Sequence, residues 1–144
     1  MQEICFTGDE AGFRDLRQRV RRWLDALGCN SSETAEIVLA VQEAAANVVR
    51  HAYGGDLSGR LVLRIRREGD RLLFRLADYA PEADGRPWPC LPPGEGRCGG
   101  WGVYLMRRIM DRVECGTPVA GEGNVLEMSK RVDGLVMRVQ HESG

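Results

Sequence analysis

The sequence predicts an α+β fold, a two-layer sandwich in which helices cover one face of a mostly antiparallel sheet. Two observations predict this class. Apolar residues recur at helical spacing in two long segments before residue 53, and the spacing changes to every second residue from residue 60 onward. We expect a strand, two helices, two strands, a long loop, a third helix and three final strands, all within a single domain of residues 1–144.

Each of the two long helices carries a recognisable signal at one end. The first follows a short strand at residues 4–6 and ends at Gly28, because glycine readily adopts the left-handed conformation found just beyond helix ends. The second begins after Asn30, which can form a capping box with Glu33, and covers residues 31–52. The expected core positions are Phe13, Leu16, Val20, Leu24 and Leu27 in the first helix and Ile37, Val38, Val41, Ala45, Val48 and Ala52 in the second.

Strand patterns follow the second helix. Apolar residues alternate on both sides of the turn Glu68-Gly69-Asp70 and predict an antiparallel hairpin. Residues 79–100 hold five of the six prolines, so they predict a long loop, and loops of this length in a compact domain are usually functional. Asp133-Gly134 favours a type I′ turn between the last two strands. The elements expected after the loop are a helix at 102–110 and strands at 112–115, 124–132 and 135–140.

Composition and charge exclude several classes of protein. The net charge is -1, which argues against broad attraction to nucleic acid or to an anionic membrane, so neither is an expected partner. The five cysteines are scattered and are not spaced as metal ligands. No apolar run reaches membrane-spanning length, and the N-terminus lacks the pattern of a signal peptide. We therefore expect a cytoplasmic location.

Three polar residues stand four positions apart in the second helix. Glu43, Asn47 and His51 are each displaced by about 40° around the helix axis, so all three follow one edge that borders the apolar stripe. A carboxylate can accept a proton from an attacking hydroxyl, and an amide oxygen is a hard ligand that suits Mg²⁺. The alternative is that Glu43 is solvated and His51 packs near the helix end. Asparagine has poor helix propensity, however, and Asn47 lies in a run rich in alanine and valine.

Two further features point to a ligand. Glycines cluster before the third helix, where backbone amides and the positive helix end can bind a phosphate, although such a segment is more often an ordinary loop. Asp78 ends an apolar strand, and a carboxylate facing inward there needs a donor such as the exocyclic amine of adenine. The alternative is a simple turn at the strand end. The clustered glycines are Gly94, Gly96, Gly99, Gly100 and Gly102.

Taken in order, these segments resemble the motifs of one family. The segment Glu43-Ala-Ala-Ala-Asn47-Val-Val-Arg-His51-Ala-Tyr53 resembles the N box of the GHKL ATPases. Within these ATPases it is most similar to the N box of the bacterial anti-sigma factor serine kinases. Their first glycine box resembles Asp78-Tyr-Ala-Pro, and their second resembles Gly99-Gly-Trp-Gly-Val-Tyr-Leu-Met-Arg-Arg-Ile-Met-Asp111. Their closing strand is similar to Gly123-Asn-Val-Leu-Glu-Met. The resemblance covers residues 9–132 and is carried mainly by the N box with the second glycine box.

The resemblance implies a Bergerat ATP-binding fold and assigns roles to residues. Glu43 would be the general base, Asn47 the Mg²⁺ ligand and Asp78 the adenine reader. Ala80 departs from the family's usual glycine, and its methyl group is expected to lower the affinity for ATP. The other residues implied to bind ATP are His51, Arg97, Gly99, Gly100, Gly102 and Asn124.

The implied activity is ATP-dependent phosphorylation of a serine or threonine. The resemblance implies a STAS-type anti-anti-sigma protein as the substrate, a sigma factor as a second partner, and homodimer formation. One alternative is a regulator that binds ATP and sequesters a partner without transferring phosphate. A third possibility, the catalytic domain of a histidine kinase, has less support, because neither His51 nor His141 is placed as a phosphoacceptor.

Overall fold

The computed structural model of the protein describes residues 1–80 and 100–136. Three helices and five strands form in this part of the chain. No helix among these residues is both long enough and apolar enough to cross a membrane. In chain order the elements are β1 (Gln2–Thr7), α1 (Glu10–Leu27), α2 (Ser31–His51), β2 (Arg60–Glu68), β3 (Arg71–Asp78), α3 (Gly100–Ile109), β4 (Arg112–Cys115) and β5 (Val125–Arg131).

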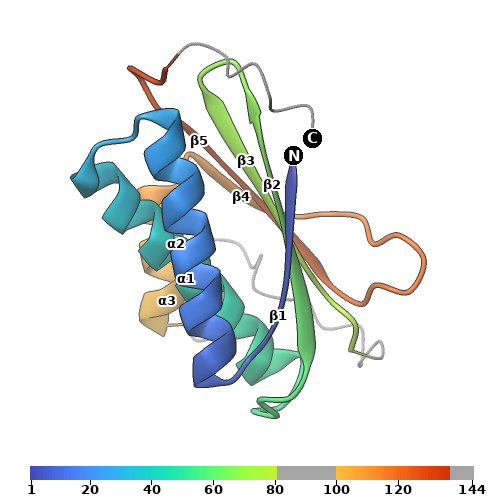
Figure 1. Ribbon diagram of the computed structural model, residues 1–144. Coiled ribbons are helices and arrows are strands. Elements are labelled where there is room, and N and C mark those ends of the chain that lie inside the picture. The colour runs from blue at the N-terminus through green and yellow to red at the C-terminus, as the bar shows by residue number, and fades with distance from the viewer. Residues whose placement is uncertain (81–99, 137–144) are drawn as a thin grey trace.

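The strands form one antiparallel sheet in the order β1-β2-β3-β5-β4. The three helices lie together on one face of this sheet, and no helix of the described residues covers the other face (Figure 1). The described residues thus form two layers, which confirms the predicted α+β sandwich. β3 is the central strand, paired with β2 on one side and β5 on the other. The end of β3 therefore lies inside the sheet rather than at its edge.

The predicted end of the first long helix and the predicted start of the second are confirmed. The Asn30 side chain accepts a hydrogen bond from the Glu33 N–H at 2.8 Å, and the Glu33 carboxylate completes the capping box. Helix α1 starts at an Asp9 cap and ends where Gly28 takes the left-handed conformation, with φ at 90°. These caps satisfy backbone groups that the helices cannot pair internally, so the sequence signals locate the ends closely.

The core fills the space between the helices and the inner face of the sheet. Of the expected helix positions, Phe13 and Ala52 are only partly buried, and the others are buried. The predicted hairpin is also confirmed, with Gly69 at positive φ in its turn. The strand side chains that meet the helices include Leu61, Leu63, Ile65, Leu72, Phe74 and Leu76.

The expected final hairpin differs from the structure. Gly134 has a φ of 79°, as a turn requires, but residues 135–136 are not a strand and do not pair with β5. Instead the Val136 N–H donates to the Leu27 carbonyl at 2.9 Å, at the end of α1. The last carbonyls of a helix have no partner within the helix. The Leu27 carbonyl therefore binds the chain after the turn, and residues 135–136 do not return to the sheet. The strand prediction is wrong for residues 135–136, and residues 137–140 lie outside the described residues.

Candidate functional site

The three polar residues along α2 differ in depth. Asn47 is fully buried, Glu43 is partly buried and His51 is exposed. Helix α2 packs against the sheet and contacts both α1 and α3, so its middle is enclosed on several sides. The expectation that all three residues border the core without entering it is therefore wrong for Asn47.

The Asn47 amide is satisfied on one side only. Its Oδ1 accepts a hydrogen bond from Arg50 Nη2 at 2.7 Å. Its Nδ2 is buried and has no hydrogen-bond partner among residues 1–80 and 100–136. A buried N–H donor left without an acceptor costs about 1–3 kcal/mol. An acceptor from beyond the described residues, such as a ligand oxygen, would remove that cost.

Glu43 lies one helical turn before Asn47 on the same edge of α2. Within the described part of the chain, its carboxylate takes part in no hydrogen bond or ion pair. A partly buried carboxylate without a donor keeps its oxygens available to accept a proton. This arrangement has the chemistry of a general base.

Asp78 is fully buried at the end of β3, and the chain itself supplies donors to it. Its Oδ1 accepts from the backbone N–H of Ala80 at 3.0 Å and of Asn124 at 3.1 Å. Its Oδ2 accepts from the Asn124 side-chain amide at 3.2 Å. A carboxylate has about four lone-pair sites, so one remains on Oδ2 for a further donor. The structure therefore brings three predicted site residues together, namely Asp78, Ala80 and Asn124.

Gly123 also belongs to this site, although it is not among the residues that the sequence predicted there. Its N–H donates to the Asp78 carbonyl at 2.8 Å. A Cβ atom added to Gly123 would lie 2.5 Å from Asp78 Oδ1 and 2.4 Å from the Ala80 carbonyl oxygen. Only glycine fits this close approach. A glycine directly before a strand is a weak signal of such contact, since many glycines in that position end loops.

Tyr53 is a second residue near Asp78 that is not among the predicted site residues. Its hydroxyl donates to the Arg60 carbonyl at 2.6 Å and accepts from the Tyr79 N–H at 2.9 Å. Burial is the main cause that raises the pKa of Tyr53, so the hydroxyl keeps the proton that it donates. The ring lies over Gly59, where a Cβ would be 2.5 Å away. Tyr53 thus connects the end of α2 with the residue that follows Asp78.

Helix α3 carries two of the predicted site glycines, Gly100 and Gly102. Lys130, in the part of β5 that pairs with the start of β3, donates through Nζ to the Ile109 carbonyl at 2.8 Å. The C-terminal end of α3 therefore lies at the start of β3, and the helix extends beside α2 away from it (Figure 1). Gly100 and Gly102 lie in the first turn of α3, at the opposite end, which is the end of β3 that holds Asp78. The first N–H groups of a helix have no internal partner and can bind an anion.

The described residues do not include every predicted site residue. Arg97 and Gly99 lie outside them. The third helix begins at Gly100 rather than at Gly102, a difference of the size at which helix ends fray.

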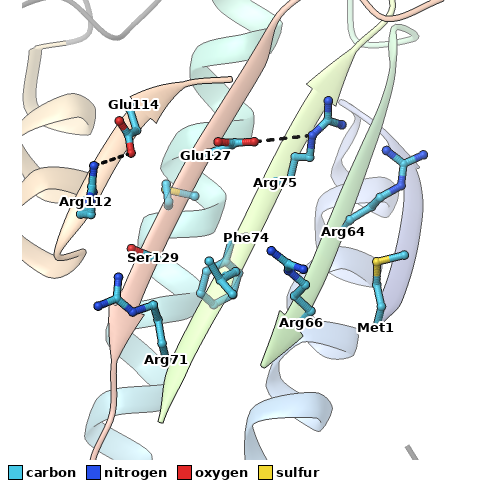
Figure 2. Close-up of a pocket in the computed structure, with 12 residues that line it drawn as sticks. Met1, Arg64, Arg66, Arg71, Phe74, Arg75, Arg112, Glu114, Glu127 and Ser129 are labelled. Atoms are coloured by element: carbon cyan, nitrogen blue, oxygen red, sulfur yellow. Dashed lines mark ion pairs between the residues drawn. The ribbon is translucent and has the colours of Figure 1, made fainter. Parts of the chain in front are cut away.

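A separate hollow opens on the face of the sheet away from the helices. It has a volume of about 400 Å³, and Figure 2 shows side chains from several strands around it. None of the predicted site residues lines it. Its charged lining residues are Arg64, Arg66, Arg71, Arg75, Arg112, Glu114 and Glu127. The hollow is therefore distinct from the site formed by α2, the end of β3 and the start of α3.

Comparison with known proteins gives the family. A family model described as the histidine kinase-like ATPase domain matches residues 6–130, which is most of the chain. The chain belongs to the histidine kinase-like ATPase family. The resemblance that the N box and the two glycine boxes predicted is confirmed.

Relatives within the histidine kinase-like ATPase family are named serine-protein kinase RsbW. The protein of this name from Bacillus subtilis is 30% identical over 125 residues, which cover 81% of this chain and 75% of the relative. The one from Bacillus velezensis is 29% identical over 123 residues, covering 80% of this chain and 74% of the relative. The similarity to both relatives thus covers about four fifths of this chain.

Two solved structures have the same fold. The RsbU and RsbW domains of a Mycobacterium tuberculosis protein align with a TM-score of 0.57 at 18% identity, covering 91% of this chain and 32% of that chain. A blue-light activated histidine kinase of Erythrobacter litoralis aligns with a TM-score of 0.51 at 19% identity, covering 72% of this chain and 31% of that chain. This chain therefore spans about a third of each of these larger proteins.

Proposed function

We propose that this protein is an ATP-dependent serine/threonine protein kinase that acts as an anti-sigma regulatory factor. Its substrate would be a STAS-type anti-anti-sigma protein, and its second partner a sigma factor. The observation that carries this proposal is the Glu43 carboxylate, which is partly buried and has no partner among the described residues. A kinase needs such a base beside its nucleotide, whereas a protein that only binds ATP does not. The relatives named serine-protein kinase support the same activity.

The adenine end of the proposed site is the Asp78 carboxylate. One lone-pair site on Oδ2 remains after the contacts with Asn124 and Ala80, and the exocyclic amine of adenine is a suitable donor for it. Burial strengthens this hydrogen bond and disfavours bases that present a carbonyl at the same position. Ala80 lies beside this contact, with its methyl group where relatives often have none, and we expect it to weaken ATP binding.

The phosphate end is supported by Asn47 and by the start of α3. The buried Nδ2 of Asn47 lacks an acceptor in the described residues, and a phosphate oxygen would supply one. The first-turn N–H groups near Gly100 and Gly102 are further donors, and His51 is the exposed polar residue at the end of α2. Arg97 and Gly99 remain in the proposal on the resemblance alone.

Magnesium would be held by Asn47 Oδ1, a hard neutral oxygen of the kind that Mg²⁺ prefers. That oxygen now accepts a hydrogen bond from the exposed Arg50, so the site fits the metal once the Arg50 guanidinium turns toward solvent or phosphate. A Mg²⁺ ion held by Asn47 would supply positive charge that neutralises the transferring phosphoryl group.

The proposed reaction is a direct transfer from ATP to the partner's hydroxyl. The hydroxyl proton passes to the Glu43 carboxylate while the hydroxyl oxygen forms a bond to the γ-phosphorus. The bond between that phosphorus and the bridging oxygen breaks, and ADP leaves with the electron pair. Rate comes mainly from positioning and charge neutralisation, as in other phosphoryl transfers. The sigma factor and the STAS protein would meet the protein in the cytoplasm, and we propose a homodimer as the working form.

One observation favours a second function. Because Arg50 already occupies Asn47 Oδ1, the protein could bind nucleotide without a well-held metal, as a regulator that sequesters its partner without transferring phosphate. A stable complex with a sigma factor or a STAS protein, formed with ATP but without phosphate transfer, would favour this alternative.

The test compares wild type with Glu43→Gln in a transfer assay with labelled ATP and STAS proteins from the source organism. We expect transfer to fall by about 10²–10⁴-fold, the usual contribution of a general base, while the affinity for ATP stays within about threefold. Glu36→Gln is the matched control, because Glu36 is an exposed carboxylate on the same helix. Normal transfer by Glu43→Gln would show that the assigned base is wrong.

A further inference from the structure

The loop between β4 and β5 reaches the adenine end of the proposed site. It extends from the sheet on the side away from the helices (Figure 1) and ends with Glu122, Gly123 and Asn124 before β5 begins. Gly123 and Asn124 supply the backbone and side-chain donors that hold Asp78. Together with the Ala80 N–H, the two Asn124 donors therefore fix where the Asp78 carboxylate points, and the Gly123 N–H holds the loop on the Asp78 backbone.

Glu122 is fixed from several directions. Its side chain is only 3% exposed, and its two oxygens accept from Arg75 at 2.9 and 3.0 Å. Arg64 Nη1 donates to Oε2 at 3.2 Å, and the Val119 N–H donates to Oε1 at 3.0 Å. The two-point contact with Arg75 fixes direction as well as distance. Chiefly through Arg75, these donors lower the pKa of Glu122 to about 2, so the carboxylate stays charged at any pH used for binding studies.

The two arginines come from the rigid part of the sheet. Arg75 lies in the middle of β3, three residues before Asp78, and Arg64 lies opposite it on β2. Arg75 also donates through Nη2 to the Thr117 carbonyl at 2.9 Å, near the other end of the loop. Both ends of the loop are thus tied to the strand that carries Asp78. The contact of Glu122 with Arg75 lies on one face of β3. The donors of Gly123 and Asn124 bind Asp78, at the end of the same strand.

We propose that Glu122 is a positioning residue for the adenine end of the nucleotide site. It holds Gly123 and Asn124 against Asp78, so that both Asn124 donors stay on the carboxylate and the free lone pair of Oδ2 keeps one direction. This inference rests on the proposed function, since it assumes that Asp78 binds the exocyclic amine of adenine. Nothing in the ATP-binding motifs includes Glu122, which lies outside all four of them.

Glu127 provides a matched control, because it contacts the same arginine, Arg75. Glu127 contacts Arg75 Nε at 3.8 Å, and Figure 2 shows this pair beside the hollow. Its side chain is 49% exposed, and it lies within β5 rather than in the loop. Removing the Glu127 carboxylate therefore changes the charge around Arg75 and leaves the loop tied.

The first experiment needs no nucleotide. Amide hydrogen exchange is measured on the full chain as wild type, Glu122→Ala and Glu127→Ala. We expect the Gly123, Asn124 and Ala80 amides to exchange at least tenfold faster in Glu122→Ala, while the amides in the middle of β3 keep their protection. Glu127→Ala should match wild type. Unchanged exchange of these three amides in folded Glu122→Ala would overturn the positioning role.

The second experiment measures base discrimination. The affinity for ATP is compared with that for purine riboside triphosphate, which lacks the exocyclic amine. We expect wild type and Glu127→Ala to prefer ATP, and Glu122→Ala to lose about tenfold in affinity for ATP while its affinity for the analogue changes by less than threefold. A merely destabilised protein would lose affinity for both nucleotides alike, and that result would overturn the proposal.

A conservative variant covers the case in which Glu122→Ala does not fold. Glu122→Gln keeps an oxygen that accepts from Arg75 and Val119 but loses the charge. We expect its preference for ATP over the analogue to lie between the preferences of wild type and Glu122→Ala. Discrimination equal to wild type in Glu122→Gln, with unchanged exchange, would contradict a role for the charged contact. If wild type binds neither nucleotide, the proposed function fails, whereas the exchange experiment still decides whether Glu122 positions the loop.

Discussion

Asp78 depends on residues far along the chain for its donors. The sequence predicted that a carboxylate facing inward at the end of an apolar strand needs a donor, and the structure confirms that Asp78 is fully buried and hydrogen-bonded. It did not predict that Asn124 supplies two of the donors, because the two residues are 46 positions apart. Only the pairing of β3 with β5 brings them together. Local sequence patterns thus predicted that Asp78 needs a hydrogen-bond donor, and the long-range pairing of the strands determines which residue supplies it.

Gly123 gives a prediction at this scale. In Gly123→Ala the new methyl group would collide with Asp78 Oδ1 and the Ala80 carbonyl, both within 2.5 Å of the added Cβ. The loop must shift away, and we expect a loss of about 1–3 kcal/mol in the free energy of unfolding, as for other overpacked sites. Urea denaturation followed by circular dichroism measures it.

Gly121→Asn is the control for this substitution. It lies in the same loop, nothing is within 4 Å of a Cβ added there, and asparagine tolerates its φ of 90° better than other side chains do. We expect its stability to stay within about 0.5 kcal/mol of wild type. Equal losses of stability in the two variants would mean that the close approach of Gly123 to Asp78 does not cause the loss in Gly123→Ala.

At the scale of elements, prediction succeeded where the signal is local and failed where it is not. The capping box of Asn30 and the left-handed Gly28 set the helix ends, and both act within a few residues. The expected strand after Asp133-Gly134 is wrong for residues 135–136, because the Leu27 carbonyl at the end of α1 captures the Val136 N–H. A turn signal indicates that the chain reverses direction. It does not say which partner the chain then meets.

The depth of Asn47 is a second limit at this scale. Helical spacing correctly placed Glu43, Asn47 and His51 along one edge of α2. It could not show that this edge is covered in the middle and open at its end, because the cover comes from packing against other elements. The roles assigned to these three residues stay predictions.

Tyr53 tests how the elements around the site are joined. Tyr53→Phe removes the hydroxyl that bonds Arg60 and the Tyr79 N–H, and leaves the ring in place over Gly59. We expect a loss of about 1–3 kcal/mol in the free energy of unfolding, since a backbone donor and acceptor lose their partner. Thermal or urea denaturation measures it.

Tyr79→Phe serves as the comparison, because its own hydroxyl forms no hydrogen bond with residues 1–80 and 100–136, and its ring still lies under Arg60. It should unfold like wild type. A Tyr53→Phe variant as stable as Tyr79→Phe would show that the end of α2 is held by packing alone.

The two faces of the sheet differ in what they carry. One face carries the three helices and the core (Figure 1), and the other carries Arg64 and Arg75, the arginines that hold Glu122 (Figure 2). The alternation of apolar and polar residues predicted this asymmetry. The proposed site lies at the end of the sheet where α2, β3 and α3 meet, and the family match gives a reason to read these elements as one ATP site. Its residues are spread from position 43 to position 124, so no single segment could define it.

Calorimetric titration of ATP with Mg²⁺ into the purified protein tests whether the proposed nucleotide site exists. We expect one ATP per chain, with an affinity that falls at least tenfold when the magnesium is chelated. Absence of binding heat up to millimolar ATP, with and without Mg²⁺, would contradict it.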